Sequence, residues 1–273
     1  MENTINGLFQ QHYVSVSDTD DTDDGVNIAP SAEIIRQFIA DTDGIEVTGV
    51  VPVTPDETAL VSGHQVVIDP VRISEIASQF SRIMMLYDSG IREVRTKLDI
   101  LSNEFKVKRN RSPIESVHCR VKSPASILEK MKKREYPLTI GSMTENISDI
   151  AGVRIICPFI EDIYTVSDML TNQDDIYIMK KKDYIKRPKE NGYRSLHLVI
   201  EVPIFLSDHK QHVRVEVQIR TMAMDFWASI EHQIHYKQSN VPQDLTEDLR
   251  RCAQSISDND EKMQEIARRL GTI

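Results

Sequence analysis

The chain of 273 residues lacks the features of a membrane or secreted protein. It contains no run of about eighteen apolar residues, and no basic segment followed by an apolar one occurs near its start. Its three cysteines, Cys119, Cys157 and Cys252, are odd in number and lack the spacing of a metal or redox motif. These absences predict a protein of the reducing cytoplasm that makes no membrane contact.

Basic residues are nearly absent from the first 70 positions. This segment holds thirteen Asp and Glu but a single basic residue, Arg36, which leaves 29 acidic and 32 basic residues (42 minus 13, 33 minus 1) in the remainder. We interpret residues 1–70 as an acidic, loosely ordered extension and residues 71–273 as a slightly basic domain. Within the extension, one or two amphipathic helical turns are suggested by Ile34, Ile35, Phe38 and Ile39.

Common phosphate-binding loops are also missing. The sequence has no Gly-x-x-x-x-Gly-Lys segment and no glycine-rich loop of the protein-kinase type. These absences exclude P-loop and protein-kinase scaffolds, so any phosphate chemistry requires another fold.

Two segments alternate apolar and polar residues. Apolar side chains recur at every second position from Leu196 to Val202 and from Val213 to Ile219, which is the periodicity of strands. If the strands pair antiparallel, His197 and Glu216 can share one face of a sheet, since side chains alternate sides with period two. The alternative interpretation is a sheet whose polar face is merely solvated.

Helix signals precede these strands. Apolar spacing of three and four predicts a long helix, or two, over 71–103, with Gly90 a weak point, followed by a basic turn at 106–112. Ser123 is a candidate N-cap and Pro124 suits the first position of a helix that runs to about Arg134. The unpaired N–H groups of such a helix start, beside Arg120 and Lys122, suit a phosphate.

A buried strand is predicted between Asp149 and Pro158, with Asp149 at its mouth and Arg154 inside it. A buried arginine needs an anion, a carboxylate or a flat ring as its partner, and a salt bridge on a solvated strand face is the alternative. A helix over 160–171, a strand near 176–180 and a basic loop over 180–189 are expected next. That loop could hold an anionic ligand beside the sheet.

Together these residues supply the parts for phosphoryl transfer between nucleotides. Cations suit phosphates, carboxylates suit Mg²⁺ and a hydroxyl proton, and flat groups suit bases. The residues are Arg120, Lys122, Asp149, Tyr193, His197 and Glu216.

Several segments, in this order, closely resemble the RelA/SpoT-type synthetase domain: 120–130, 149–155, 192–197, 216–221 and 226–232. The resemblance covers residues 71 to about 270 and is to a small alarmone synthetase of the RelP/RelQ kind. It implies an α/β (α+β) fold, with a mixed, mainly antiparallel sheet flanked by helices, a nucleotidyltransferase-like core, and long N- and C-terminal helices. The implied reaction transfers pyrophosphate from ATP to the ribose 3′-hydroxyl of GTP or GDP, giving (p)ppGpp and AMP.

The resemblance also implies a role for each site residue. ATP would be held by Arg120 and Arg154 on either side of adenine, and by Lys122, Ser126, Lys130 and Lys133 at the phosphates. GTP or GDP would be held by Tyr193 stacked on guanine, by Lys189 and His197 at the phosphates, and by Gln218 in support. Asp149 would bind Mg²⁺, and Glu216 would either complete that metal site or accept the 3′-hydroxyl proton.

One departure from the family bears on regulation. Relatives activated by their own product carry Phe-Val-Thr-Gly where this chain has Ser116-Val117-His118-Cys119, and Asn where it has Asp225. The aromatic and small residues that would hold a guanine are replaced, and a carboxylate is added. We therefore expect no stimulation by (p)ppGpp.

The last segment has a heptad-like spacing. Residues alternate at four and three in the set Leu249, Cys252, Ile256, Asn259, Met263, Ile266 and Leu270. A helix over about 242–270 that joins subunits is one interpretation, and a helix that packs on its own domain is the other. The resemblance favours a homo-oligomer, specifically a tetramer.

Two other functions remain open at this point. A toxin-like relative would pyrophosphorylate tRNA 3′ ends, but it would need a basic RNA-binding surface, and the excess of three basic residues (32 minus 29) is small. RNA contact is therefore not predicted. A catalytically silent nucleotide-binding or RNA-binding regulator is the third possibility, and the complete set of candidate site residues argues against it.

Overall fold

The computed structural model describes residues 30–31, 34–35, 37–38, 70–237 and 243–273. The chain forms two compact units, one from Met1–Met85 with Lys122–Ile147 and the other from Leu86–Val121 with Ser148–Ile273. Among the described helices, none is long and apolar enough to cross a membrane.

Helix α3, Pro70–Arg109, is longer than the sequence pattern predicted. The basic residues Lys106, Lys108 and Arg109 form its last turn, so the prediction of a basic turn from 106 onward was wrong there. Positive side chains suit a helix C-terminus, where the free carbonyls carry partial negative charge. The turn begins instead at Asn110, which has a φ of 55°, a conformation that Asn tolerates better than most residues.

The first unit is helical in its described part. Its helices α4, Pro124–Lys133, and α5, Ile140–Asn146, each begin after a capping side chain. The predicted N-cap is confirmed, because the Ser126 N–H donates to Ser123 Oγ at 3.3 Å. Phe38 is helical and buried, and its ring meets that of Phe80 edge to face at 5.8 Å. Of the predicted early helical turns, Ile39 lies outside the described residues, as does most of the acidic extension.

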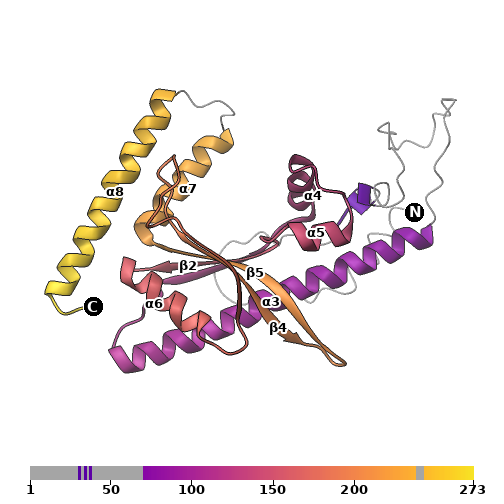
Figure 1. Ribbon diagram of the computed structural model, residues 1–273, viewed down its shortest axis with the longest axis horizontal. Coiled ribbons are helices and arrows are strands. Elements are labelled where there is room, and N and C mark those ends of the chain that lie inside the picture. The colour runs from indigo at the N-terminus through magenta and orange to yellow at the C-terminus, as the bar shows by residue number, and fades with distance from the viewer. Residues whose placement is uncertain (1–29, 32–33, 36, 39–69, 238–242) are drawn as a thin grey trace. The chain divides into compact units, whose positions relative to one another are not determined.

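The second unit is built on a five-stranded sheet in the order β1-β2-β5-β4-β3 (Figure 1). Strand β2 runs parallel to β5, and the other three neighbouring pairs are antiparallel. The predicted mixed, mainly antiparallel sheet is therefore confirmed. The strands are β1 (Ser116–Val121), β2 (Ala151–Cys157), β3 (Tyr177–Asp183), β4 (Leu196–Phe205) and β5 (Lys210–Thr221).

One face of the three central strands is apolar and buried. Its side chains alternate along β2, β4 and β5, and among them Ile155, Leu198 and Val217 have no exposed surface. Helix α3 comes close to this face at Gly90, where an added Cβ would lie 2.9 Å from Val213 Cγ1. Gly90, the predicted weak point of α3, is thus the position where the absence of a side chain lets the helix approach β5.

Strand β3 lies at the edge of the sheet and corrects the prediction of a basic loop over 180–189. Lys180, Lys181 and Lys182 belong to the strand, which ends at Asp183. Lysines on an edge strand discourage pairing with the edge of another sheet. Only the second half of the basic segment forms a turn.

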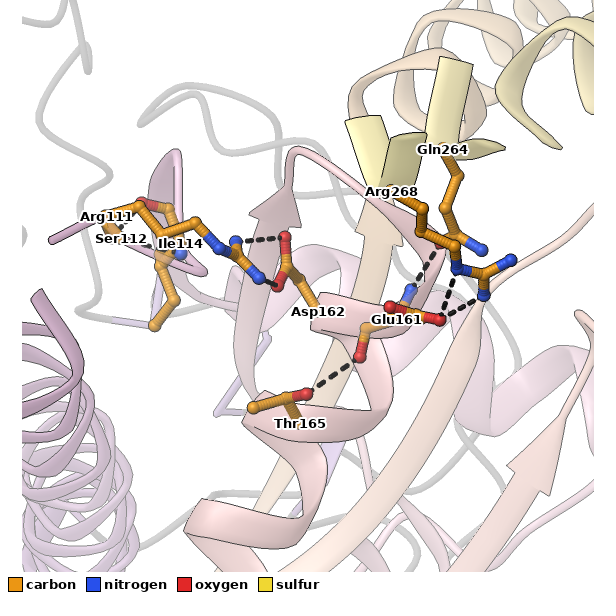
Figure 2. Close-up of polar contacts among 8 residues, drawn as sticks. All are labelled: Arg111, Ser112, Ile114, Glu161, Asp162, Thr165, Gln264 and Arg268. Carbon is orange, nitrogen blue, oxygen red and sulfur yellow. Dashed lines mark hydrogen bonds and ion pairs between the residues drawn. The ribbon is translucent and has the colours of Figure 1, made fainter. Parts of the chain in front are cut away.

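Helix α6, Ile160–Thr171, follows β2 within the predicted bounds. Arg111 makes two hydrogen bonds to the fully buried Asp162, at 2.9 and 2.7 Å (Figure 2). Asp162 lies in the first turn of α6, where a negative charge also complements the helix dipole. This ion pair fixes the turn after α3 against the start of α6.

Helices α7, Met222–Lys237, and α8, Gln243–Arg269, complete the unit and lie against each other (Figure 1). The Trp227 indole N–H of α7 donates to the Leu249 carbonyl of α8 at 3.0 Å. Helix α8 buries the face formed by Ala253, Ser257, Asp260, Gln264 and Ala267. Of the predicted heptad seam, Met263, Ile266 and Leu270 are exposed, whereas Ile256 packs against the buried cluster of Trp227, Ala228 and Ala253.

Candidate active site

The second face of the sheet carries polar side chains in register. Directly paired residues point to the same side, so Arg154 on β2, Gln218 on β5 and His197 on β4 form one row across three strands. A neighbouring row contains Arg120 on β1, Gly152 on β2 and Glu216 on β5. The sequence expectation that His197 and Glu216 share a face is confirmed.

Both oxygens of the Glu216 carboxylate face a hydrogen-bond donor. Gln218 Nε2 donates to Oε2 at 2.9 Å, and His197 Nδ1 lies 3.7 Å from Oε1. Burial raises the pKa of Glu216, but hydrogen bonds from His197 and Gln218 and the charge of His197 outweigh it, so the net pKa is lowered. Glu216 is therefore an ionised carboxylate at neutral pH and can accept a proton or bind a cation.

Tyr193 lies in the loop before β4, next to Gly192. Gly192 has a φ of 91°, and an added Cβ would lie 2.5 Å from the Cβ of Ala253 on α8. The Tyr193 hydroxyl is 2.8 Å from His197 Nε2, and Lys189 Nζ lies 4.6 Å from the centre of its ring. Burial raises the pKa of Tyr193 against an opposing effect of Arg220, so the hydroxyl stays protonated. A flat ring thus adjoins His197, with the Lys189 cation over that ring.

Asp149 ends the segment before β2 and acts on the same carboxylate. Its negative charge is the smallest of the effects on the pKa of Glu216 and opposes the net lowering, so the two carboxylates repel each other. Such a pair suits a shared divalent cation, because oxygen ligands of this kind are what Mg²⁺ prefers. Within the described part of the chain, no group of three or more acidic, His or Cys side chains is placed to hold a metal by itself. The residues fit an ion that is also bound by a substrate's phosphates.

The remaining candidates for ATP binding belong to the first unit. Lys122 precedes α4, and Ser126, Lys130 and Lys133 are spaced at four and three along it, so they share one side of the helix. Arg120 and Arg154 belong to the second unit with Asp149, Lys189, Tyr193, His197, Glu216 and Gln218.

Two residues that the sequence analysis did not include among the catalytic and substrate-binding candidates join these side chains. Arg220 is 5% exposed, and it donates to Gln218 Oε1 at 2.5 Å and to the Tyr193 hydroxyl at 3.2 Å. Asp225, at the start of α7, lies 3.3 Å from Arg220 Nη1 and 3.4 Å from Arg154 Nε, through the same oxygen. The sequence did contain a signal for Arg220. Strand alternation places Ile219 on the apolar face and Arg220 on the polar face. Its partners could not be inferred, since Tyr193 is 27 positions away.

Known proteins are similar to this chain in sequence and in structure. Residues 119–241 match the family described as the region found in RelA / SpoT proteins. The chain is 44% identical over 199 residues to the GTP pyrophosphokinase YwaC of Bacillus subtilis, covering 72% of this chain and 95% of that protein. It is 42% identical to the GTP pyrophosphokinase YjbM of the same organism, covering 69% and 88%.

Solved structures of small alarmone synthetase 1 from Bacillus subtilis share the fold. The one bound to its product pppGpp has a TM-score of 0.64 and 40% identity, covering 69% of this chain and 96% of that chain. The one bound to AMPCPP has a TM-score of 0.61 and 38% identity, covering 72% and 100%. By sequence and by fold, the chain belongs to the small alarmone synthetases of the RelA/SpoT family.

Proposed function

We propose that this protein is a GTP pyrophosphokinase, which transfers pyrophosphate from ATP to the ribose 3′-hydroxyl of GTP or GDP. The observation that carries the proposal is the group of side chains around the Glu216 carboxylate. His197 faces Glu216 on the same side of the sheet, Tyr193 contacts His197 from the loop before β4, and the charge of Asp149 acts on Glu216 from the segment before β2. The names of the relatives, and the product and ATP analogue bound in the solved structures, support the same reaction.

In this reaction the acceptor 3′-oxygen attacks the β-phosphorus of ATP. The bond from that phosphorus to the oxygen bridging to the α-phosphate breaks, AMP leaves with the bridging oxygen, and the acceptor gains the β- and γ-phosphoryl groups. The hydroxyl proton needs an acceptor near the attacking oxygen. Glu216 supplies an ionised carboxylate held by two donors, and we assign it this role.

A divalent cation fits the site, and Asp149 with Glu216 would hold it. The mutual repulsion of these two carboxylates is the feature that a cation would relieve. When bound, Mg²⁺ neutralises charge on the transferred phosphates.

The substrate-binding roles follow from side-chain chemistry. We assign adenine to the guanidinium planes of Arg120 and Arg154, and the ATP phosphates to Lys122, Ser126, Lys130 and Lys133. We assign guanine to the Tyr193 ring, and the acceptor phosphates to Lys189 and His197, with Gln218 in support. Lys189 lies over the Tyr193 ring at 4.6 Å, which puts a cation beside the proposed stacking surface.

The proposed enzyme is not stimulated by (p)ppGpp. The Ser116 hydroxyl lies 3.2 Å from His118 Nε2, so polar groups stand where activated relatives carry an aromatic ring and small residues. Asp225 adds a carboxylate that is already shared by Arg154 and Arg220. An initial-rate titration with pppGpp should be flat, and activation by several-fold would contradict the proposal.

We also propose that α8 joins subunits into a homo-oligomer, specifically a tetramer. Met263, Ile266 and Leu270 are 59%, 49% and 76% exposed on the face of α8 that does not pack on its own unit. Exposed apolar residues repeated along one helix face are typical of an interface.

The reaction is tested by incubating the protein with ATP and Mg²⁺ and, separately, with GDP, GTP or deacylated tRNA. We expect AMP together with a guanosine tetra- or pentaphosphate. Release of AMP with tRNA alone would instead indicate the tRNA-modifying activity, and no AMP with any acceptor would contradict catalysis.

A further inference from the structure

Arg220 is the starting point of two arms of polar contacts that meet again at Glu216. In the first arm, Arg220 Nη2 donates to Gln218 Oε1 at 2.5 Å and Gln218 Nε2 donates to Glu216 Oε2 at 2.9 Å. In the second arm, Arg220 Nη2 donates to the Tyr193 hydroxyl at 3.2 Å, which lies 2.8 Å from His197 Nε2. His197 Nδ1 then faces Glu216 Oε1 at 3.7 Å. One guanidinium therefore reaches both oxygens of the same carboxylate.

The two ends of the arms restrict the direction of the hydrogen bonds between them. A guanidinium can only donate, and an ionised carboxylate can only accept. The Gln218 amide must then turn its oxygen to Arg220 and its nitrogen to Glu216. His197 needs a proton on Nδ1, since a lone pair there would face the Glu216 carboxylate. When Nε2 of His197 carries no proton, it accepts the proton of the Tyr193 hydroxyl, which lies 2.8 Å away.

Arg220 is itself fixed in place from the opposite side. Asp225 Oδ1 lies 3.3 Å from Arg220 Nη1, and the Arg220 guanidinium carbon lies 5.5 Å from the centre of the Tyr193 ring. With 5% of its surface exposed, Arg220 has no access of its own to a substrate. Its contacts are to the side chains that surround the proposed acceptor site.

We propose that Arg220, held by Asp225, is a positioning residue that orients the Glu216 carboxylate and the Tyr193 ring for pyrophosphate transfer. The inference rests on the proposed function, because Glu216 and Tyr193 take their roles from it. The Asp225 oxygen that holds Arg220 also lies 3.4 Å from Arg154, to which we assign adenine. Asp225 thus contacts both Arg154, which we assign to ATP, and Arg220, which contacts the Tyr193 that we assign to the acceptor nucleotide.

The kinetic test compares Arg220→Lys with Arg214→Lys as a matched control. Lysine keeps the charge beside Asp225 but lacks the planar fork that reaches Gln218 and Tyr193 together. We expect Arg220→Lys to lower kcat about tenfold or more and to leave the KM for ATP within about twofold. Arg214 lies on the same strand and pairs with Glu201 at 3.5 Å, away from the two arms. A kcat within about twofold of wild type in a folded Arg220→Lys protein would overturn the proposal.

Asp225→Asn separates the positioning role from general damage to the fold. Asparagine keeps an oxygen for Arg220 but removes the charge that is shared with Arg154. We expect a lower kcat together with a raised KM for ATP, in contrast to Arg220→Lys, with an unchanged circular dichroism spectrum. If neither constant changes, Asp225 does not hold the arginines as proposed.

A spectroscopic test needs no enzymatic activity. In protein labelled with ¹⁵N-histidine, with His197 assigned by comparison with His197→Gln, the ring of neutral His197 should carry its proton on Nδ1. A proton on Nε2 in the wild-type protein would overturn the inference even if the chain released AMP from ATP. Conversely, absence of AMP with the Nδ1 proton present would reject the proposed function and leave the two arms intact.

Discussion

Gly192 lies in the loop before β4, and both its backbone conformation and its packing disfavour a side chain at this position. Its φ of 91° disfavours any side chain, and an added Cβ would meet Ala253 at 2.5 Å. We expect Gly192→Ala to lower the free energy of unfolding by about 1–3 kcal/mol, measured by urea denaturation. The KM for GDP should rise because Tyr193 is the next residue.

The control for this substitution is Gly141→Ala in α5, where an added Cβ has no neighbour within 4 Å. Alanine there should be neutral or stabilising by up to about 1 kcal/mol, as expected in a helix. Equal stability of Gly192→Ala and wild type would show that the loop relaxes freely.

Asp260 gives a pH prediction at the residue scale. Burial raises its pKa, while the hydrogen bond from the Thr221 hydroxyl, at 2.6 Å, partly opposes this. A raised folded-state pKa means that the folded protein binds the proton more tightly than the unfolded chain does. The charged Asp260 carboxylate therefore lowers the free energy of unfolding at neutral pH. This penalty shrinks as the pH falls below the folded-state pKa and is gone below the pKa of the unfolded chain.

Asp260→Asn keeps an oxygen for Thr221 and removes the charge. We expect the variant to be more stable than wild type at neutral pH, and the difference between them to shrink on acidification. Thermal unfolding across a pH series measures both, with the exposed Asp258→Asn on the same helix as the control. A variant less stable than wild type at neutral pH would contradict the assignment.

At the scale of elements, the sequence predicted segments whose signals are local. The capping serine at 123, the apolar spacing of α6 and the alternation of β4 and β5 were enough to locate these elements. The shared sheet face of His197 and Glu216 was also predictable, since side chains two positions apart on an alternating strand point to the same side. The last turn of α3 was missed because a basic cluster suits both a turn and a helix end.

The elements that sequence alone could not predict depend on distant partners. The inward face of α8 carries Ser257, Asp260 and Gln264, which the polar-outside rule assigns to solvent. Asp260 bonds to Thr221 and Gln264 to the start of α6, and both partners are far away in the chain. The link from Asp225 through Arg220 to Glu216 required the folded arrangement for the same reason.

Helix α6 depends on α8 for its N-terminal cap. Its N-cap residue Phe159 offers no side-chain hydrogen bond, and the Glu161 N–H donates instead to Gln264 Oε1 at 2.8 Å (Figure 2). Arg268 adds an ion pair to Glu161. We expect Gln264→Ala to cost about 1 kcal/mol of unfolding free energy, as for the loss of other helix caps.

Gln254→Ala provides the comparison for this loss, because Gln254 is exposed on the same helix and bonds to Arg194 at 3.0 Å. Its cost should stay below about 0.5 kcal/mol. If the two variants have equal midpoints in urea, the bond from Glu161 to Gln264 does not cap α6 in solution.

At the scale of the whole molecule, the two faces of α8 have different tasks. The inward face closes its own unit by polar contacts, and the outward face offers apolar side chains. We expect Ile266→Glu to yield a smaller species than wild type in light scattering coupled to size exclusion, since a charge would be buried in the subunit interface. Phe205→Glu, at an exposed position on β4, should leave the mass unchanged. A monomeric wild-type protein would contradict assembly through α8.

Release of AMP from ATP in the presence of Mg²⁺ and GDP, measured for wild type and for Glu216→Gln, tests the central claim most directly. Glutamine preserves the size of the side chain but cannot take up a proton as the carboxylate does. With wild type we predict AMP and a guanosine tetraphosphate in equal amounts. With a folded Glu216→Gln protein that still binds ATP, we predict that the rate of AMP release falls by about 10²-fold or more. Equal rates for the two proteins would remove Glu216 from the mechanism and contradict the account of this site.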